Sequence, residues 1–217
     1  MPVVLLVRHG QASFGAADYD ELSDAGRAQA ETVGGELARR GLRRPVAVHG
    51  TLRRQRDTAS IALAAAGIDV KPRVDGRWDE YDHLDLLKRY VRPDVPTPAS
   101  SREVQGLLDS ALLAWVEHGG APDQPDGWPA FAGGAADALH ELLDGLEKGS
   151  DAVVFTSGGV IAAVCASLLG LGAEGVVALN RVTVNGAITK LVAGSTGPSL
   201  LTFNEHAHLA ADAVTYR

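Results

Sequence analysis

The chain has 217 residues, of which 46% are hydrophobic, and its formal net charge is −7 at pH 7. A chain of this length can bury one sizeable core, so we expect a single domain over residues 1–217. The acidic balance disfavours a general nucleic-acid binder, and it means that an anionic substrate must be attracted by a local cluster of cations.

The cysteine content and the first apolar run indicate the cellular setting. Cys165 is the only cysteine and lies in an apolar stretch, so we expect a buried thiol and no intramolecular disulfide. The apolar run Val3–Val7 ends at the charged Arg8 and is too short for a secretion signal or a membrane span. We therefore expect a cytoplasmic protein without a membrane partner.

The first third of the chain predicts strands alternating with helices. Val3–Val7 is a continuous β-branched and aliphatic run, which is typical of a central strand buried on both faces. Ser23 can cap a helix over Asp24–Arg40 that stops at Gly41. This order of elements predicts a parallel sheet. The next predicted elements are a strand at Pro45–His49, a helix at Leu52–Ala66 ended by Gly67, and an extended segment at Ile68–Val74.

The middle of the chain does not show alternating strands and helices, whereas the last third shows this alternation again. Arg92–Pro129 is rich in proline, glycine and aspartate around a helical patch at Val104–Val116, and we interpret it as an inserted cap. The later predicted elements are a helix at Ala130–Leu146, a strand at Ala152–Thr156, a helix at Val160–Leu169, and strands at Val182–Val192 and Leu200–Asn204 that pair near a sheet edge through a turn at Gly194–Pro198.

The turn after the first predicted strand, Arg8-His9-Gly10, carries residues suited to phosphate chemistry. It follows the carboxyl end of a buried strand, where open α/β sheets bind their ligands. A neutral imidazole can attack a phosphoryl group if its other nitrogen is held by a hydrogen bond, and an adjacent arginine offers a planar donor fork to phosphate oxygens. Taken alone, the tripeptide fits an exposed loop equally well.

A second segment strengthens the phosphate interpretation. After the second predicted strand, residues 50–59 read Gly-Thr-Leu-Arg-Arg-Gln-Arg-Asp-Thr-Ala. With Arg8-His9-Gly10 this resembles the histidine phosphatase superfamily, also called phosphoglycerate mutase-like, whose pattern there is Ser-x-Leu-x-Arg-x-x-x-Thr-Ala. Gly50 replaces the serine. Residues 22–30, Leu-Ser-Asp-Ala-Gly-Arg-Ala-Gln-Ala, are similar to the family's first-helix start.

The resemblance implies a fold and a set of phosphate ligands. The fold is α/β, a three-layer α/β/α sandwich with a mainly parallel central sheet and a cap inserted at about 92–129. His9 is the implied phosphate-accepting nucleophile, and Arg8 and Arg54 are the implied phosphate-binding arginines. Because a charge-assisted hydrogen bond contributes roughly 1.5–3 kcal/mol, two arginines could hold a phosphate dianion without metal. They would also disfavour protonation of His9. Arg53 and Arg56 are interpreted as solvated.

The proton donor for the leaving oxygen is expected in the segment Trp78–His83. Glu80 resembles the glutamate of the family's Leu-x-Glu segment, and a buried carboxyl beside a phosphate has a raised pKa that suits a general acid. Asp79 and Asp82 remain alternatives as acids or as helix caps. Gln11 is an expected substrate contact, and it makes the first turn closer to the Arg-His-Gly-Gln form of the phosphatases than to the Arg-His-Gly-Glu form of the mutases.

The last motif departs from the family pattern. Thr156-Ser157-Gly158-Gly159 resembles a strand end followed by Ser-His-Gly-Gly, and Ser157 stands where the family's second active-site histidine is expected. A serine hydroxyl donates one hydrogen bond but brings no charge, so activity could be weaker. Ser157 and Gly158 at a helix start are still expected to contact phosphate. His49 could compensate or simply be hydrogen-bonded at a strand end. His206 and His208 are interpreted as structural.

The predicted function is a phosphomonoester hydrolase that forms a phosphohistidine on His9. The alternatives are a phosphoglycerate mutase-type phosphotransferase and a phosphoester-binding homologue that has lost catalysis through Ser157. Histidines and acids are not gathered at metal-ligand spacing and nucleotide-binding glycine motifs are missing, so we expect no metal and no cofactor. The expected partner is a small phosphorylated substrate rather than a nucleic acid, and a homodimer stays open.

Overall fold

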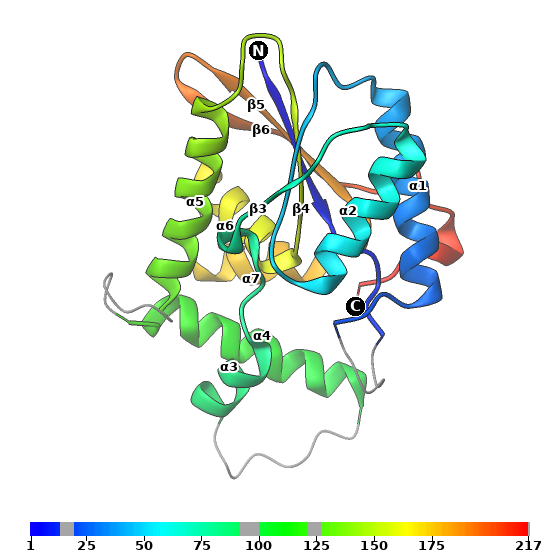
Figure 1. Ribbon diagram of the computed structural model, residues 1–217. Coiled ribbons are helices and arrows are strands. Elements are labelled where there is room, and N and C mark those ends of the chain that lie inside the picture. The colour runs from blue at the N-terminus through cyan, green and yellow to red at the C-terminus, as the bar shows by residue number, and fades with distance from the viewer. Residues whose placement is uncertain (14–19, 92–99, 121–126, 217) are drawn as a thin grey trace.

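The central sheet of the protein is mixed and mainly parallel. A computed structural model describes residues 1–13, 20–91, 100–120 and 127–216. Within these ranges six strands form one sheet in the order β3-β2-β4-β1-β5-β6 (Figure 1). The first four strands in the chain are parallel to one another, β5 pairs antiparallel with β1, and β6 pairs antiparallel with β5. The strands are β1 (Val3–Arg8), β2 (Val46–His49), β3 (Arg73–Val74), β4 (Ala152–Thr156), β5 (Ile188–Gly194) and β6 (Gly197–Glu205).

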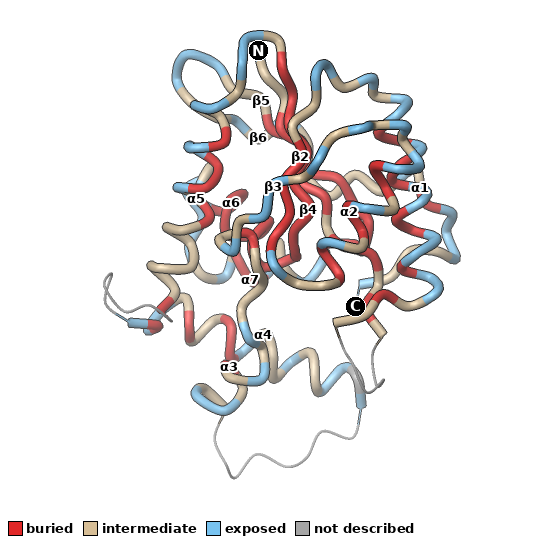
Figure 2. The backbone as a smooth tube through the Cα atoms, in the orientation of Figure 1, coloured by how far each residue is buried: buried red, intermediate tan, exposed pale blue. Residues whose placement is uncertain are grey.

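Helices cover both faces of this sheet, which makes three layers (Figure 1). Side chains alternate along β1, so that Leu5 and Val7 pack against α1 (Asp24–Arg40) and α2 (Arg53–Ala66), while Val4 and Leu6 pack against α5 (Trp128–Asp144) and α6 (Gly158–Leu169). Figure 2 shows the buried residues concentrated in the strands and on the helix faces turned toward them. The predicted α/β/α architecture with a buried first strand is confirmed.

Three further helices lie beyond the carboxyl ends of the parallel strands (Figure 1). They are α3 (His83–Tyr90), α4 (Ser101–His118) and α7 (Ala173–Val182). Leu86, Leu112 and Val177, one from each helix, share a separate apolar cluster with the rings of Tyr81 and Phe131. None of the helices in the described ranges is long and apolar enough to cross a lipid bilayer.

Most predicted elements are confirmed, and the clearest correction concerns the segment before β5. Residues 182–187 were predicted as part of a strand, but α7 runs to Val182 and the strand begins only at Ile188. The turn between them is made by Asn185 and Gly186, and Gly186 has a φ of 74°, in the left-handed region that favours glycine. The predicted helix at Val104–Val116 is confirmed within α4, whereas 92–99 and 121–126 of the predicted cap lie outside the described residues.

The loop after β1 touches the first turn of α1 so closely that both contacts require glycine. A Cβ atom added to Gly26 would lie 2.1 Å from the carbonyl oxygen of Gln11, and one added to Gly10 would lie 2.2 Å from the carbonyl oxygen of Gly26. The N-terminus of α1 is fixed by Ser23, whose Oγ accepts a hydrogen bond from the Gly26 amide at 3.1 Å, as predicted. The close approach therefore fixes the path of the chain beside His9.

We expect Gly26→Ala to lower the free energy of unfolding by about 1–3 kcal/mol, because the new methyl group must displace backbone rather than a flexible side chain. The matched control is Gly35→Ala on the same helix, where nothing lies within 4 Å of the added Cβ. That control should raise the free energy of unfolding by about 0.5–1 kcal/mol through helix propensity. Urea denaturation of both variants measures the difference, and equal effects of the two substitutions would contradict the close contact.

Candidate active site

The candidate site lies at the edge of the sheet where the parallel strands end. In the pairing of β1 with β4, Arg8 lies opposite Thr156, so His9 and Ser157 both follow at this edge. β2 ends at His49 beside β4, and α2 begins shortly after it. Ligands of open α/β sheets bind outside the carboxyl ends of the strands. The fold therefore brings together motifs from three separate parts of the sequence.

The His9 ring is buried and held in one orientation. Its side chain is 5% exposed, and its Nδ1 lies 2.7 Å from the carbonyl oxygen of Gly10. Because a carbonyl oxygen only accepts hydrogen bonds, Nδ1 carries the proton and Nε2 is the unprotonated nitrogen. Nε2 accepts a hydrogen bond from Nε of Arg54 at 3.1 Å. The Gly10 amide in turn donates to Oγ1 of Thr58, which ties the turn to α2.

The surroundings of His9 favour its neutral form. Burial lowers the pKa of His9 well below the ordinary value of 6.5, and the positive charges of Arg54 and Arg8 lower it further. The hydrogen bond to Gly10 opposes this shift only in part. The ring is therefore a neutral imidazole at neutral pH, with a lone pair on Nε2.

Two guanidinium groups flank His9, and the backbone and an aspartate position them. Arg8 donates from Nη1 to the carbonyl oxygens of Thr183 and Tyr216, the latter at 3.0 Å. Arg54 donates from Nη1 to Oδ1 of Asp20 at 2.6 Å. The carboxylate of Asp20 also accepts a hydrogen bond from the Arg53 amide at 2.6 Å, so it caps the N-terminus of α2. The sequence motifs gave no signal for the part that Asp20 plays.

Glu80 is the acid of its segment that reaches the same space as His9. Its Oε2 accepts a hydrogen bond from the Gly159 amide at 3.1 Å, at the start of α6. Burial raises the pKa of Glu80 above its ordinary value of 4.5, and the Gly159 amide and the two arginines lower it by less. The other two candidates have structural partners, because Asp79 accepts hydrogen bonds from Thr51 and Asp82 caps α3.

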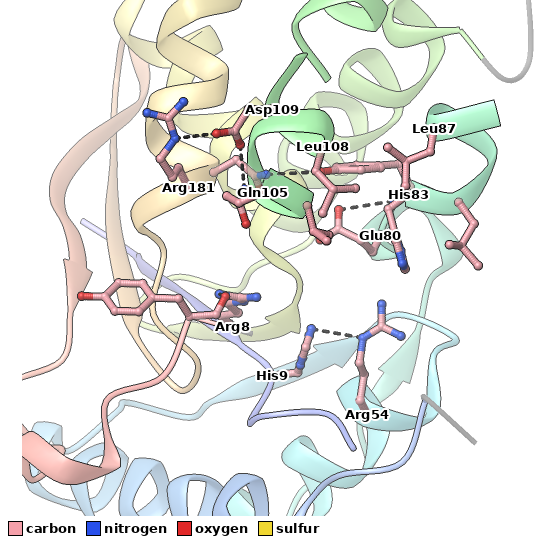
Figure 3. A pocket seen from close by; sticks show the side chains of 15 residues that line it. Arg8, His9, Arg54, Glu80, His83, Leu87, Gln105, Leu108, Asp109 and Arg181 are labelled. Atoms are coloured by element: carbon pink, nitrogen blue, oxygen red, sulfur yellow. Dashed lines mark hydrogen bonds and ion pairs between the residues drawn. The ribbon is translucent and has the colours of Figure 1, made fainter. Parts of the chain in front are cut away.

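A cavity of about 250 Å³ opens between these residues and the helices beyond the sheet edge (Figure 3). Arg8, His9, Arg54 and Glu80 all line it, and Figure 3 shows Glu80 across the cavity from His9 and Arg54. The described residues contain no group of three or more His, Cys, Asp or Glu side chains that could hold a metal ion. The remaining lining residues are Tyr81, His83, Leu84, Leu87, Val104, Gln105, Leu108, Asp109, Asn180, Arg181 and Tyr216.

Three residues predicted to touch the substrate do not line this cavity. Gln11 turns toward α1, where its Oε1 accepts a hydrogen bond from the Ser23 hydroxyl at 2.9 Å. Gly158 lies against the side chain of Arg8, since an added Cβ would lie 3.6 Å from Arg8 Nε. Ser157 is fully buried.

Gln55 is the direct partner of Ser157, and no motif pointed to it. Both side chains are fully buried, and Nε2 of Gln55 donates to Oγ of Ser157 at 2.8 Å and to the carbonyl oxygen of Trp78 at 2.9 Å. A Cβ atom on Gly50 would lie 2.0 Å from Oε1 of Gln55, so Gly50 leaves the room that the amide group fills. The only sign of this contact in the sequence is Gly50, which stands where the family pattern has a serine.

The remaining histidines of interest have local backbone partners. Nδ1 of His49 lies 2.6 Å from the carbonyl oxygen of Gly50, and His49 does not line the cavity. Nδ1 of His206 and Nε2 of His208 likewise face the backbone carbonyls of Asn204 and Gly186. A further contact that the motifs did not reveal is made by Asn185, whose side-chain amide donates to the carbonyl oxygen of His9 at 3.2 Å.

Comparison with known families shows what kind of protein carries this site. Residues 4–206 match the model of the histidine phosphatase superfamily, branch 1. The chain belongs to this superfamily. The match includes the segments that carry His9, Arg54 and Glu80, so the resemblance seen in the sequence motifs is confirmed at the level of the family.

Two curated relatives of this chain are a mutase and a phosphatase by name. The chain is 28% identical over 214 residues to a 2,3-bisphosphoglycerate-dependent phosphoglycerate mutase of Mesorhizobium japonicum, with 89% of this chain and 94% of the relative covered. It is 31% identical over 189 residues to a glucosyl-3-phosphoglycerate phosphatase of Mycolicibacterium vanbaalenii, with 77% of this chain and 74% of the relative covered.

A solved structure agrees with the fold of this member of the superfamily. The structure of a mycobacterial glucosyl-3-phosphoglycerate phosphatase superimposes with a TM-score of 0.68 at 24% sequence identity. The superposition covers 95% of this chain and all of the other. The mixed α/β architecture with its six-stranded sheet is therefore that of the phosphoglycerate mutase-like proteins.

Proposed function

We propose that this chain is a phosphomonoester hydrolase that works without a metal ion, with His9 as nucleophile and Glu80 as proton donor. The observation that carries the proposal is the state of the His9 ring, which is neutral, anchored through Nδ1 and unprotonated at Nε2. A nucleophile needs such a lone pair, and the hydrogen bond that Nε of Arg54 donates to it is released as phosphorus approaches Nε2. Glu80 and two guanidinium groups line the same cavity.

The proposed reaction has two steps, and Glu80 changes its role between them. In the first, Nε2 of His9 forms a bond to phosphorus, the bond from phosphorus to the ester oxygen breaks, and Glu80 gives its proton to that oxygen. In the second, a water molecule gives a proton to the Glu80 carboxylate and its oxygen attacks phosphorus. The nitrogen–phosphorus bond then breaks, inorganic phosphate dissociates, and His9 returns to its neutral form.

Arg8 and Arg54 supply the positive charge that the transferring group needs. Each lies beside His9, and each is fixed by a carbonyl or carboxylate partner rather than by solvent. Prepositioned donors of this kind stabilise charge without having to reorganise during the reaction. The net charge of the chain is negative, so this local pair is what attracts a phosphate dianion.

A phosphoglycerate mutase is the second candidate, because a mutase is among the relatives of this chain. It would return the phosphoryl group from His9 to another hydroxyl of the substrate instead of to water. The phosphatase relative and the glutamine at position 11 favour hydrolysis. A phosphoester-binding protein without turnover is the third outcome.

One experiment separates these functions. The protein is incubated with p-nitrophenyl phosphate and with 3-phosphoglycerate, the release of phosphate is followed, and the quenched protein is examined for an acid-labile phosphoryl group on His9. Phosphate release through such an adduct supports the hydrolase. Interconversion of phosphoglycerates without net release selects the mutase, and phosphate binding with neither adduct nor turnover selects the binding protein.

We further propose that Ser157 occupies the position of the family's second active-site histidine, and that Gln55 fills the space an imidazole would need. The support is that Ser157 directly follows β4 beside the His9 turn, and that its hydroxyl is in contact with Gln55 at 2.8 Å. The Gln55 amide is neutral, so this pair brings no positive charge to the site. The expected consequence is slower phosphoryl transfer.

Restoring the histidine should therefore require two substitutions. Ser157→His alone overpacks a fully buried site beside Gln55, and we expect it to cost about 1–3 kcal/mol of unfolding free energy with little gain in rate. Ser157→His combined with Gln55→Ala should raise kcat on p-nitrophenyl phosphate by about ten- to a thousandfold, corresponding to about 1.4–4 kcal/mol. Steady-state kinetics with Gln55→Ala as control tests this. A folded double variant with unchanged kcat would overturn the assignment of Ser157.

A further inference from the structure

The far side of the catalytic cavity is lined by aliphatic side chains at helical spacing. Leu84 and Leu87 lie three residues apart on α3, and Val104 and Leu108 lie four residues apart on α4. Residues at these spacings share one face of a helix. Both helices therefore turn an apolar stripe toward the cavity, and Figure 3 shows Leu87 and Leu108 on the side of the cavity opposite His9 and Arg54.

The arginine and the aspartate on this side of the cavity are paired with each other. Nε of Arg181 donates to Oδ2 of Asp109 at 2.8 Å, and Nε2 of Gln105 donates to Oδ1 of the same carboxylate at 2.7 Å. Among the described residues that line the cavity, the side chains with a permanent positive charge are Arg8 and Arg54 beside His9 and this Arg181, and His83 at the start of α3 is the further basic side chain. A carboxylate on a substrate would have to approach Arg181 next to Asp109, which repels it.

From this distribution of charge we infer that the preferred substrate is the monophosphate ester of a compact, uncharged and largely apolar alcohol. The inference rests on the proposed phosphatase function and deepens it. The phosphate dianion lies between Arg8 and Arg54, and the alcohol carbon atoms extend toward the stripes on α3 and α4. The cavity volume of about 250 Å³ lies just below the range of about 300–1,000 Å³ that is usual for small-molecule sites, so the alcohol is small.

A series of primary alkyl phosphates tests the inference on the unmodified protein. Ethyl, propyl and butyl phosphate share nearly the same leaving oxygen, so differences in kcat/KM report contacts to the chain. Because each buried methylene contributes about 0.8 kcal/mol, kcat/KM should rise about threefold to fourfold per methylene. Butyl phosphate should exceed 3-phosphoglycerate by at least about tenfold. A flat series, or a preference for 3-phosphoglycerate, overturns the inference.

Variants locate the effect in the cavity wall. Leu108→Asn keeps the side-chain size but removes the apolar surface, so it should flatten the alkyl series, while Leu201→Asn on β6, whose leucine is 54% exposed, should leave it unchanged. Asp109→Asn releases Arg181 from its partner and should shift the ratio of kcat/KM toward 3-phosphoglycerate by about tenfold. An unchanged alkyl series in Leu108→Asn also overturns the inference.

Failure of the proposed function is recognised separately. If no ester in the panel is hydrolysed and no phosphoryl group appears on His9, the hydrolase proposal itself fails. If p-nitrophenyl phosphate is hydrolysed through the adduct but chain length has no effect, the hydrolase stands and the substrate class proposed here is wrong.

Discussion

Replacing His9 by alanine is expected to reduce phosphate release from p-nitrophenyl phosphate by about 10⁴-fold or more, as loss of a covalent nucleophile does in other enzymes. The acid-labile phosphoryl group should disappear at the same time. The reason is that the Nε2 lone pair is removed, while the side chains of the other cavity residues remain. Rapid quench followed by mass spectrometry measures the adduct.

Binding distinguishes this loss from a collapse of the site. Arg8 and Arg54 keep their partners at Tyr216 and Asp20 in the His9→Ala variant, so inorganic phosphate should still bind within about tenfold of its original Kd. His140→Ala, at an exposed position on α5, is the matched control and should retain full turnover. Wild-type turnover or a persisting adduct in His9→Ala would show that another residue is the nucleophile.

The parts of the site that could be predicted from sequence are those fixed by short local patterns. The strand–turn at Arg8 and the helix start at Arg54 each carry their chemistry within a few residues, and the sheet then brings them to a common edge. Glu80 could be chosen among the neighbouring acids by resemblance to the family. The two neighbouring acids have structural partners instead, because Asp79 accepts a hydrogen bond from Thr51 and Asp82 caps α3.

Contacts made over long sequence separations could not be predicted in this way. Asp20, which precedes α1, accepts a hydrogen bond from Arg54 on α2. Asn185 donates to the carbonyl oxygen of His9, and Gln55 donates to Ser157. None of these pairs leaves a periodic or spaced pattern in the sequence. The cavity wall is of the same kind, because it depends on how α3 and α4 pack beyond the sheet rather than on any motif.

The wrong prediction for the segment before β5 has a physical cause. The segment before β5 looked like a strand because Val182 and Val184 are β-branched, but Val182 ends α7 and the buried Val184 lies in the irregular segment before the turn at Asn185 and Gly186. Tertiary packing of α7 against α4 and α6 outweighs the weak local preference. Gln11, which is predicted as a substrate contact from its place after His9, accepts a hydrogen bond from Ser23 at the start of α1 in this structure.

Replacing Glu80 by glutamine should slow turnover of butyl phosphate by about 10²–10⁴-fold, because its alkoxide needs a proton as it leaves. Dinitrophenyl phosphate has a leaving group that needs no proton, so its first step should slow by less than about tenfold. The second step still needs a base for water, and the variant should therefore show a burst of dinitrophenol and accumulate phosphohistidine. Stopped-flow absorbance and quenched-flow measurements test both steps.

The pH dependence of kcat gives an independent test of Glu80 as the proton donor. The pKa of Glu80 is raised above 4.5 by burial, so its acid form persists as pH rises past 4.5 and is lost above the raised value. With butyl phosphate, kcat should fall on that alkaline side in the wild type, and this limb should be missing in Glu80→Gln. Glu147→Gln, whose side chain is 79% exposed, is the control that keeps the limb. If Asp79→Asn or Asp82→Asn shows the leaving-group dependence instead, the proton comes from that residue. The hydrogen bond that now holds its carboxylate, to Thr51 or to the start of α3, must then break during the reaction.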